Sequence, residues 1–441
     1  MHIPKNLKVA VIGGGGREHA ICWKLAQSNY VKEIYCLPGN GGTAGVEKVK
    51  NENIAVSDFA AIADFCATNK VDLVVVGPDN PIADGIVDYL QERQLRVFGP
   101  LKEAAKLESS KVFAKEFMVR NRIPTAKYLV AESYEQAIDI VREHPWARVI
   151  KADGLALGKG VFVCDTVEQC DEALAAIFKE RRFGEAGNVV ALEEKLSGEE
   201  ISLLAFCDGS RLSLMPASQD HKRRFDGDKG PNTGGMGAYS PVELYNRCEA
   251  EIEEQVLEPI RKALVSGDLV YQGILYIGLM VETREVDADK KVYQPYVLEF
   301  NARFGDPETQ AILPLLESDL LPVLWACTDG RLHKVEVNWL KQASCCVAAV
   351  TKEYPEKSSK GEPIDFGWLG EPGIVIFQAG TKLDGTNLVT NGGRILSSTG
   401  IAPTLEEAVQ KAYSGLGSIQ FKTMAFRNDI ARRAAAGCLS R

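Results

Sequence analysis

The sequence has no long hydrophobic run, few histidines and no paired cysteine motif. Its 441 residues include five histidines that lack metal-ligand spacing, and 11 cysteines without a C-x-x-C pair. The longest apolar stretches, such as 345–350, fall far short of the about 20 residues that a membrane helix requires. The first residues contain no signal-peptide core. These absences argue against membrane insertion and disulfides, and we expect reduced thiols and a cytoplasmic location.

The chain also lacks an excess of basic residues. It has 51 lysines and arginines against 60 aspartates and glutamates, which gives a net charge of -9. A protein that binds nucleic acid through a general basic surface is therefore disfavoured. Anionic small molecules are still acceptable ligands, because they need only a local cationic site. The composition, 45% apolar and 25% charged, is typical of a soluble globular chain. At roughly 150 residues per domain, the length suggests about three domains.

Apolar runs and helical patterns alternate through the first hundred residues. Strand-like runs at 9–12, 34–37 and 73–76 are separated by segments with helical spacing. This alternation predicts a doubly wound parallel sheet. Ser109 and Ser110 are candidate N-caps for the helix that follows.

Beyond that helix, a smaller strand and helix unit covers 128–194, and long strands are expected at 273–281 and 296–300. Short strands near 374–379 and 394–397, with a helix from Thr404, indicate a last domain. The fold class is therefore α/β, in three parts: 1–108, 109–330 and 331–441.

The first glycine-rich motif is Gly13-Gly14-Gly15-Gly16-Arg17-Glu18-His19, which follows a strand and opens a helix. In this context backbone N–H groups and the helix dipole can hold an anion. A tight turn without a ligand would give the same pattern. A dinucleotide fingerprint requires a third glycine where Glu18 stands and an acidic residue near 37–40. Both are missing, so a nicotinamide enzyme is not expected.

Two further segments are rich in glycine. Residues 151–160, Lys-Ala-Asp-Gly-Leu-Ala-Leu-Gly-Lys-Gly, join two expected strands and could fold over a phosphate chain. They do not form a P-loop, and a mobile hairpin with solubilising lysines is the alternative. The polar stretch 218–237 is too long for a simple connection and is either disordered or functional. Its glycines suggest a loop that closes over a ligand, although His221 alone would be interpreted as a surface histidine.

Acidic residues mark two more candidate sites. Period-two geometry places Glu299 and Asn301 on one strand face and Phe300 on the other. Two oxygen ligands on one face suit Mg²⁺, although a polar strand face is the common alternative. The neighbouring segment 303–308 adds two carboxylates and a guanidinium to this candidate site. Residues 193–200 could present backbone groups to an adenine and an acid to ribose hydroxyls, or form an exposed turn.

In their order and spacing, these segments resemble the phosphoribosylamine-glycine ligase family of the ATP-grasp superfamily. The resemblance covers nearly the whole chain and is most specific at 218–223, 230–239 and 299–308. It also includes Gly77-Pro78-Asp79, Ala379-Gly380-Thr381-Lys382 and Thr390-Asn391-Gly392-Gly393-Arg394. It implies an N-terminal doubly wound parallel-sheet domain, a two-part ATP-grasp domain with a mobile lid at about 125–195, and a small C-terminal α+β domain.

The resemblance further implies the reaction. ATP would phosphorylate the glycine carboxylate, and the amine of 5-phosphoribosylamine would attack the acyl phosphate. The products would be glycinamide ribonucleotide, ADP and phosphate, in de novo purine biosynthesis. Mg²⁺, or Mn²⁺ by the same oxygen-ligand logic, would be the cofactor. The expected partners are glycine, 5-phosphoribosylamine and ATP, with a transient contact with the preceding pathway enzyme, no nucleic acid and no membrane.

Site residues follow from the same resemblance, position by position. Catalytic roles fall to Arg303, which would face the transferred phosphate, and to Asp306, which would orient an amino group. The metal ligands would be Glu299 and Asn301. The ATP-binding set comprises Lys111, Lys151, Gly158, Lys159, Gly160, Glu193, Glu194, Leu196 and Glu200. The phosphoribosylamine-binding set comprises Gly16, Arg17, Glu18, Asp79, Lys382 and Arg394.

One position departs from the wider superfamily. Many relatives carry an additional metal carboxylate on the preceding strand, where this chain has Gly278, and Glu282 lies four residues further on. The number of metal ions is therefore open.

Two other functions are compatible with part of this pattern: a different ATP-grasp ligase or carboxylase, and a non-catalytic nucleotide sensor. The segments within 218–239 disfavour the ligase or carboxylase. The intact Lys151, Glu299, Asn301 and Arg303 disfavour the sensor.

Overall fold

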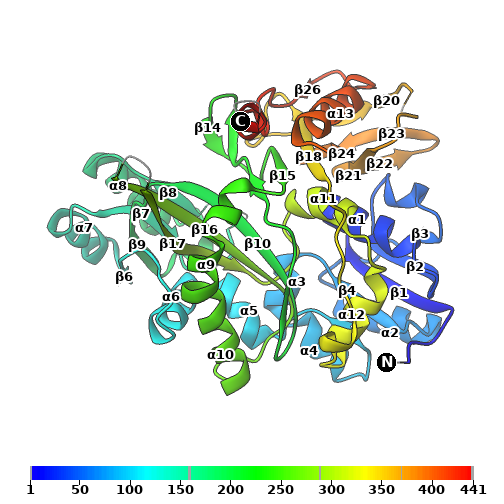
Figure 1. Cartoon of the computed structure of the whole chain (residues 1–441), viewed down its shortest axis with the longest axis horizontal. Coiled ribbons are helices and arrows are strands. Elements are labelled where there is room, and N and C mark those ends of the chain that lie inside the picture. Colours follow the sequence, from blue (N-terminus) through cyan, green and yellow to red (C-terminus); the bar gives the residue numbers. More distant parts are fainter. Residues whose placement is uncertain (1, 157–159, 288–289, 369, 439–441) are drawn as a thin grey trace.

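The N-terminal part of the chain is a doubly wound parallel sheet, as its alternating pattern predicts. The computed structural model describes residues 2–156, 160–287, 290–368 and 370–438 (Figure 1). All strand pairs in this first sheet are parallel, in the order β3-β2-β1-β4-β5. The strands are β1 Leu7–Gly13, β2 Val31–Pro38, β3 Val49–Asn51, β4 Leu73–Val76 and β5 Val97–Phe98. The helices are α1 Gly16–Ala26, α2 Phe59–Asn69, α3 Asp79–Asp84 and α4 Ile86–Gln91.

The first two helices after this sheet lead into the central region. They are α5 Lys102–Ser109 and α6 Lys111–Arg120. The Oγ atom of Ser110 accepts a hydrogen bond from the N–H of Phe113 at 3.1 Å, which confirms Ser110 as the N-cap of α6. This cap fixes where α6 begins, and so places Lys111 on its first turn.

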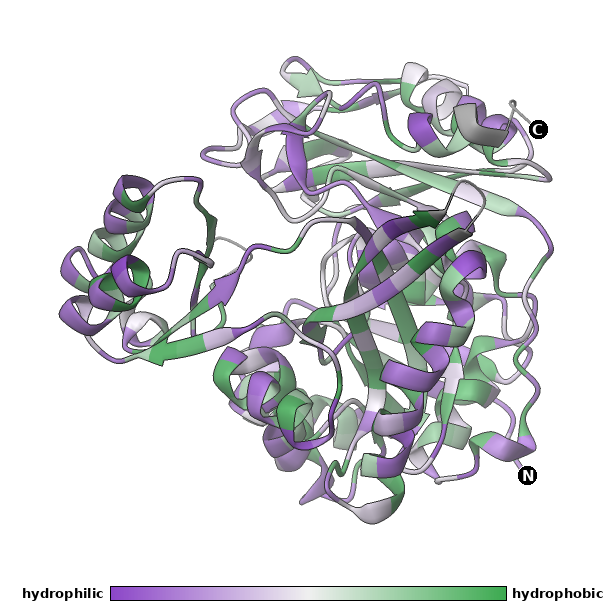
Figure 2. Ribbon diagram, turned by 60° about the vertical axis from the view of Figure 1, so that its left-hand side comes forward, coloured by the Kyte–Doolittle hydropathy of each residue, from purple (hydrophilic) through white to green (hydrophobic). Residues whose placement is uncertain are grey.

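A small antiparallel unit follows α6 and projects from the rest of the molecule (Figure 2). Its sheet has the order β6-β9-β7-β8. The elements are β6 Tyr128–Ala131, α7 Tyr134–Glu143, β7 Ala147–Ala152, β8 Val161–Val163, α8 Val167–Leu174 and β9 Val190–Glu194. Its buried apolar residues, between Ala131 and Leu192, form a hydrophobic cluster separate from the other cores. The unit therefore packs its own interior.

A second antiparallel sheet forms the centre of the molecule, in the order β11-β10-β16-β17. Its long strands extend the two expected at 273–281 and 296–300. The strands are β10 Glu199–Asp208, β11 Leu212–Leu214, β16 Gln272–Asp287 and β17 Lys290–Asn301. The accompanying helices are α9 Glu243–Ile252, α10 Glu258–Ser266, α11 Glu308–Ile312 and α12 Leu320–Thr328.

The C-terminal region is built on a third sheet that includes strands from the middle of the chain. Its path is β12-β15-β18-β24-β21, and β26 also pairs with β18. The polar stretch 218–237 thus contributes ordered strands rather than a disordered connection. The strands are β12 Gln219–Asp220, β15 Gly237–Ser240, β18 Ala343–Thr351, β21 Ile374–Gln378, β24 Arg394–Ala402 and β26 Met424–Ala425.

Smaller elements complete the fold. Helix α13, Leu405–Gly417, covers β18 and β24 and begins with a capping box formed by Thr404 and Glu407. The last helix is α14, Arg432–Cys438. Short strands pair as β13 with β14, as β19-β23-β22 and as β20 with β25. Their bounds are β13 Arg223–Phe225, β14 Lys229–Asn232, β19 Lys360–Pro363, β20 Asp365–Phe366, β22 Thr381–Asp384, β23 Asn387–Asn391 and β25 Ile419–Gln420.

Two expectations from composition can be compared with this fold. The ten cysteines from Cys22 to Cys346 are all buried free thiols. Within the described ranges, none of the helices combines the length and the apolar character that a membrane crossing demands.

Candidate active site

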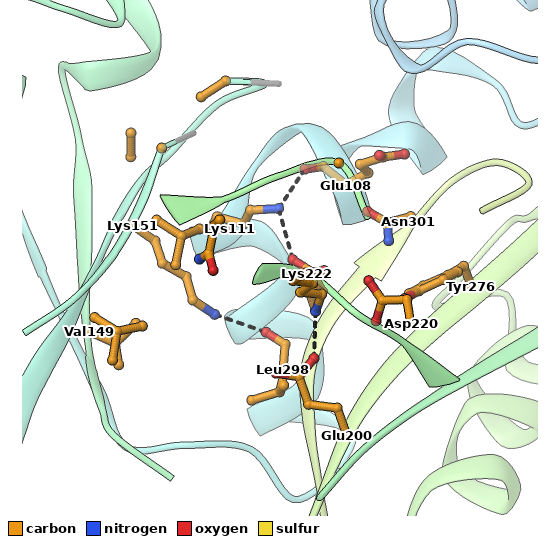
Figure 3. Close-up of a pocket in the computed structure, with 18 of the residues that line it drawn as sticks. Glu108, Lys111, Val149, Lys151, Glu200, Asp220, Lys222, Tyr276, Leu298 and Asn301 are labelled. Atoms are coloured by element: carbon orange, nitrogen blue, oxygen red, sulfur yellow. Dashed lines mark hydrogen bonds and ion pairs between the residues drawn. The ribbon is translucent and has the colours of Figure 1, made fainter. Parts of the chain in front are cut away.

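A cavity of about 400 Å³ lies between the small projecting unit, the central sheet and the end of the polar stretch 218–237 (Figure 3). Its walls come from all three regions, so residues distant in sequence meet there. Lys151 and Glu299 line this same cavity. The charged residues that line it are Asp79, Glu108, Lys111, Lys151, Glu193, Glu194, Lys195, Glu200, Asp220, Lys222, Glu299, Arg303, Asp306 and Glu308.

Lys111 brings the first positive charge to the cavity. It stands at the start of α6, where the Ser110 cap fixes the backbone. Its Nζ atom lies 4.0 Å from Oε2 of Glu299 and donates to the carbonyl of Glu108 at 3.4 Å. Figure 3 shows the contact of Lys111 with Glu108 as a dashed line. Lys111 is therefore held at the edge of the candidate metal site.

Lys151 links the small unit to the central sheet. It lies on β7, and its Nζ atom donates to the carbonyl of Leu298 on β17 at 3.1 Å. The same ammonium is 3.0 Å from Oε2 of Glu193, which lies 2.9 Å from Nζ of Lys115. Glu193 is thus buried between two lysines. The sequence assigned Glu193 to the adenine-binding segment, with an exposed turn as the alternative, whereas Glu193 lies buried on β9. Lys115 was not identified, because its helical position gave no indication of this contact.

The predicted metal ligands share one face at the end of β17. Phe300 points to the other side and packs edge-to-face against Phe117, with ring centroids 5.9 Å apart. Burial alone would raise the pKa of Glu299. The positive charges of Lys222, Lys111, Lys151 and Arg303 outweigh burial, and together they lower this pKa to about 2. The carboxylate is therefore ionised at neutral pH, as a metal ligand must be.

The oxygen donors here fit Mg²⁺ only in part. Glu299 and the largely buried Asn301 supply two hard oxygens, and a magnesium ion would take further oxygens from phosphates and water. Across the described part of the chain, no cluster of three or more Asp, Glu, His or Cys side chains is arranged to hold a metal. Gly278 lies directly opposite Glu299 in the β16–β17 ladder. Glu282 lies opposite Gln294 and forms an ion pair with Arg284 at 2.7 Å, so it does not supply the missing ligand.

Arg303 forms an ion pair with one carboxylate and interacts electrostatically with a second. Its Nη2 atom lies 2.9 Å from Oε1 of Glu108, and Oε2 of Glu108 accepts a hydrogen bond from the N–H of Ala302 at 2.7 Å. Burial raises the pKa of Asp79, but the charges of Arg303 and Arg17 outweigh burial and the net pKa is lowered. These contacts aim the guanidinium into the cavity without exhausting its donors.

Asp306 joins the cavity to the N-terminal and C-terminal regions. Its Oδ1 atom lies 3.1 Å from Nη2 of Arg394 and accepts a hydrogen bond from Gln310 at 2.6 Å. Arg17 donates to the carbonyl of Phe304 at 2.9 Å and is paired with Glu18, also at 2.9 Å. The turn 15–18 and Arg394 therefore flank the Asp306 end of the cavity.

The structure brings most of the predicted site residues together. The following ones line the cavity directly: Asp79, Lys111, Lys151, Gly160, Glu193, Glu194, Leu196, Glu200, Glu299, Asn301, Arg303 and Asp306. Gly16, Arg17, Glu18 and Arg394 stand beside it through the contacts of the segment 304–310. Lys382 lies on exposed β22, outside the cavity lining. Gly158 and Lys159 lie outside the described residues.

Several cavity residues were not identified from the sequence as site residues. Lys222 is paired with Glu200 at 2.6 Å, and Asp220, two residues earlier, shares the cavity wall. Burial raises the pKa of Asp220 to about 8, although Lys222 opposes the shift. Glu308, in contrast, was expected beside the candidate metal site as part of 303–308; it lines the cavity and accepts a hydrogen bond from Tyr276 at 3.0 Å. The alternation Asp220-x-Lys222 resembles that of Glu299-x-Asn301, and the same period-two argument could have identified it.

Family models match three successive parts of the chain. They are described as the N domain, the ATP-grasp (A) domain and the C domain of phosphoribosylglycinamide synthetase, over residues 7–108, 109–309 and 344–433. A phosphoribosylamine–glycine ligase of Caldanaerobacter subterraneus subsp. tengcongensis is 41% identical over 96% of this chain and 99% of its own length. The chain belongs to the phosphoribosylamine–glycine ligase family.

Relatives of this family differ in length. The bifunctional purine biosynthetic protein purD of Dictyostelium discoideum is 42% identical over 97% of the chain, which covers 55% of that protein. The chain thus spans about half the length of its bifunctional and trifunctional relatives. A crystal structure of phosphoribosylamine–glycine ligase from Thermotoga maritima matches with a TM-score of 0.80 and 35% identity, over 96% of this chain and all of that one. The α/β architecture expected for the family is therefore confirmed.

Proposed function

We propose that the chain is an ATP-dependent ligase that joins glycine to 5-phosphoribosylamine in de novo purine biosynthesis. The products are glycinamide ribonucleotide, ADP and inorganic phosphate. The observation that carries the proposal is the convergence of Lys111, Lys151, Arg303 and Glu299 on one cavity. Membership in the phosphoribosylamine–glycine ligase family supports the choice of substrates.

The reaction needs activation because a free carboxylate has a poor leaving group. A glycine carboxylate oxygen first attacks the γ-phosphorus of ATP, and ADP leaves with the electrons of the broken bond. The amine nitrogen of phosphoribosylamine then attacks the acyl carbon of glycyl phosphate. The C–O bond breaks, inorganic phosphate leaves, and the nitrogen loses a proton. Holding three substrates together and keeping water from the acyl phosphate accounts for the catalysis.

In this mechanism the cationic residues neutralise the phosphates, as in other phosphoryl transfers. Lys111 and Lys151 bind the nucleotide phosphates, and Arg303 faces the transferred phosphoryl group. Glu299 and Asn301 would hold Mg²⁺ or Mn²⁺, which supplies charge neutralisation when bound. The remaining ATP set is Gly158, Lys159 and Gly160 over the phosphates, Glu193, Glu194 and Leu196 at the adenine, and Glu200 at the ribose.

The acceptor is assigned to the other end of the cavity. Asp306 orients an amino group, and its ion pair with Arg394 supports a site where amine and phosphate are held close together. Gly16, Arg17, Glu18 and Asp79 would surround the sugar, with Lys382 and Arg394 on its phosphate. A transient contact with the enzyme that supplies the unstable amine belongs to the same proposal.

The domain division at 108 and 330, with a mobile lid at about 125–195, is part of the proposal. The separate hydrophobic cluster of the small unit supports a lid that can move as a body. Lys151 crosses from that unit to the carbonyl of Leu298, so closure of the lid would carry a phosphate-binding charge with it.

The decisive experiment measures ADP release against a panel of carboxylate and amine substrates. Release that requires both glycine and phosphoribosylamine is expected. Requirement for another acceptor would favour a different ATP-grasp ligase or carboxylase, and binding of ATP without turnover would favour a sensor. With ¹⁸O in the glycine carboxylate, one label should reach inorganic phosphate. Its complete absence there would exclude the acyl phosphate.

A further inference from the structure

The hairpin formed by β13 and β14 is a weak element in an important place. Its two strands form a sheet of their own, and a two-stranded hairpin alone is marginally stable. The residues just before it, Asp220 and Lys222, line the cavity, and so do Asn232, Thr233 and Gly234 at its other end. Something else must therefore fix the hairpin if these cavity residues are to keep their positions.

The C-terminal segment 427–431 contacts the hairpin at its tip, and Figure 1 shows β14 beside the C-terminal end of the chain. The carboxylate of Asp226 accepts hydrogen bonds from the backbone N–H and the side-chain amide of Asn428, at 2.8 and 3.0 Å. The N–H of Gly227 donates to Oδ2 of Asp429 at 2.8 Å. The tip is thus bound by residues about 200 positions later in the chain.

Arg427 is the centre of this contact. Its guanidinium pairs with both oxygens of Asp429, at 2.7 and 2.8 Å, and with Asp228 at 2.9 Å. It also donates to the carbonyl of Arg223 at 3.1 Å. The side chain is 1% exposed. Removal of this buried guanidinium would leave Asp429 without its ion pair and Asp228 with only the exposed Arg433, and would break the bridge between the tail and the hairpin.

We call these contacts between the segment 427–431 and the β13–β14 hairpin the clamp. Further hydrogen bonds connect the clamp to the cavity wall. The N–H and the hydroxyl of Thr233 donate to the carbonyl of Lys222, at 2.8 and 2.9 Å, and close the base of the hairpin. Nε2 of His221 accepts a hydrogen bond from the N–H of Ala431 at 3.3 Å. Tail contacts thus fix both the tip and the approach to Lys222, whose ammonium is paired with Glu200.

We propose that Arg427 is a positioning residue for the reaction, because it holds the hairpin that places Lys222 and Thr233 in the cavity wall. Arg427 touches no substrate in this proposal. Its kinetic consequence rests on the proposed function, whereas its effect on the hairpin does not. The proposed adenine residues Glu193–Leu196 make none of these contacts, and the clamp reaches the nucleotide site only through the pair of Lys222 with Glu200, so nucleotide binding should change less than turnover.

The test compares R427M with R433M and R427K. Arg433 pairs with the same Asp228 at 3.4 Å but is 86% exposed, which makes R433M a matched control. Phe225 is 51% exposed on the hairpin, so limited chymotrypsin cleavage after it, identified by mass spectrometry, reports how firmly the hairpin is held. R427M should cleave at least about tenfold faster than R433M, and R427K should fall between them because lysine keeps the charge but not the planar fork.

Activity supplies the second readout. R427M should lower kcat at least about tenfold while the Kd for ADP changes less than about twofold, and R433M should match the parent protein. Equal cleavage rates for R427M and R433M, or equal kcat values, would overturn the proposal. If R427M does not fold, D226A removes two contacts at an exposed position and should show the same changes to a smaller degree. If the parent protein itself lacks ligase activity, the proposed function fails, and the cleavage comparison still decides the clamp.

Discussion

Gly278 lies directly opposite Glu299 in the β16–β17 ladder, so the strand beside the candidate metal ligand carries no side chain there. A carboxylate at this place would have supplied a second acidic donor, and a third side-chain oxygen beside Glu299 and Asn301. Its absence leaves Glu299 as the acidic ligand from these two paired strand positions. The charge of Glu299 therefore matters more than it would in a site with several carboxylates.

Replacing Glu299 by Gln should lower the magnesium-dependent formation of ADP about a hundredfold or more, since losing one preorganised charged ligand costs that order in rate. The side chain keeps its size, so the apparent Tm should change little. Steady-state assays over a range of Mg²⁺ concentrations measure the effect. Turnover equal to that of the parent protein would remove Glu299 from the metal site.

Replacing Gly278 by Ala tests the same pair from the other side. A Cβ atom at Gly278 would lie 3.2 Å from Cγ of Glu299, closer than an ordinary van der Waals contact. The carboxylate would have to shift by a few tenths of an ångström, so the KM for Mg²⁺-ATP should rise about threefold to tenfold with a normal Kd for ADP measured without metal. An unchanged dependence on Mg²⁺ would show that Glu299 tolerates the shift or does not bind the ion.

Local patterns predicted much of this site because they depend on neighbouring residues. The Ser110 cap and the common face of Glu299 and Asn301 follow from helix and strand geometry within a few positions. The contact of Lys115 with Glu193 joins residues 78 positions apart, and no period reveals it. The pairing of β15 with β18 is equally long-range. Such contacts depend on how the sheets pack, which the order of residues along the chain does not express.

Lys382 and Arg394 should respond differently to substitution, although both were assigned to the acceptor phosphate. Lys382 is exposed and stands apart from the cavity lining, so K382A should raise the KM for phosphoribosylamine severalfold with little effect on kcat. Arg394 also neutralises Asp306 and donates to its backbone carbonyl at 2.8 Å. R394A should therefore lower kcat as well.

Both variants are assayed with phosphoribosylamine generated in situ, and the KM for ATP is measured in parallel. The phosphate-site assignment requires that the KM for phosphoribosylamine rises much more than that for ATP. Equal rises for the two substrates would contradict it. A normal acceptor KM in K382A would remove Lys382 from the site and leave Arg394 as the candidate.

Lys115 provides a test of pH dependence. Burial is the main cause that lowers its pKa to about 8, with Lys151 adding to the effect and Glu193 opposing it. The unfolded chain keeps the proton up to a pH near 10.5, whereas the folded protein releases it near pH 8. The unfolded state therefore binds more protons between these values, so this group makes the folded protein more stable as the pH rises from 8 to 10.5.

Replacing Lys115 by Met removes this contribution. Between pH 8 and 10 the parent protein should gain free energy of unfolding relative to K115M, by about 1–3 kcal/mol, since each pKa unit corresponds to about 1.4 kcal/mol. Below pH 8 the difference between the two proteins should stay constant. Urea unfolding at several pH values measures both curves, with the exposed K106M as control. If the free energies of unfolding of the parent protein and K115M change in parallel above pH 8, Lys115 keeps its proton in the folded state. In that case the charge of Glu193 compensates for the burial of the Lys115 ammonium.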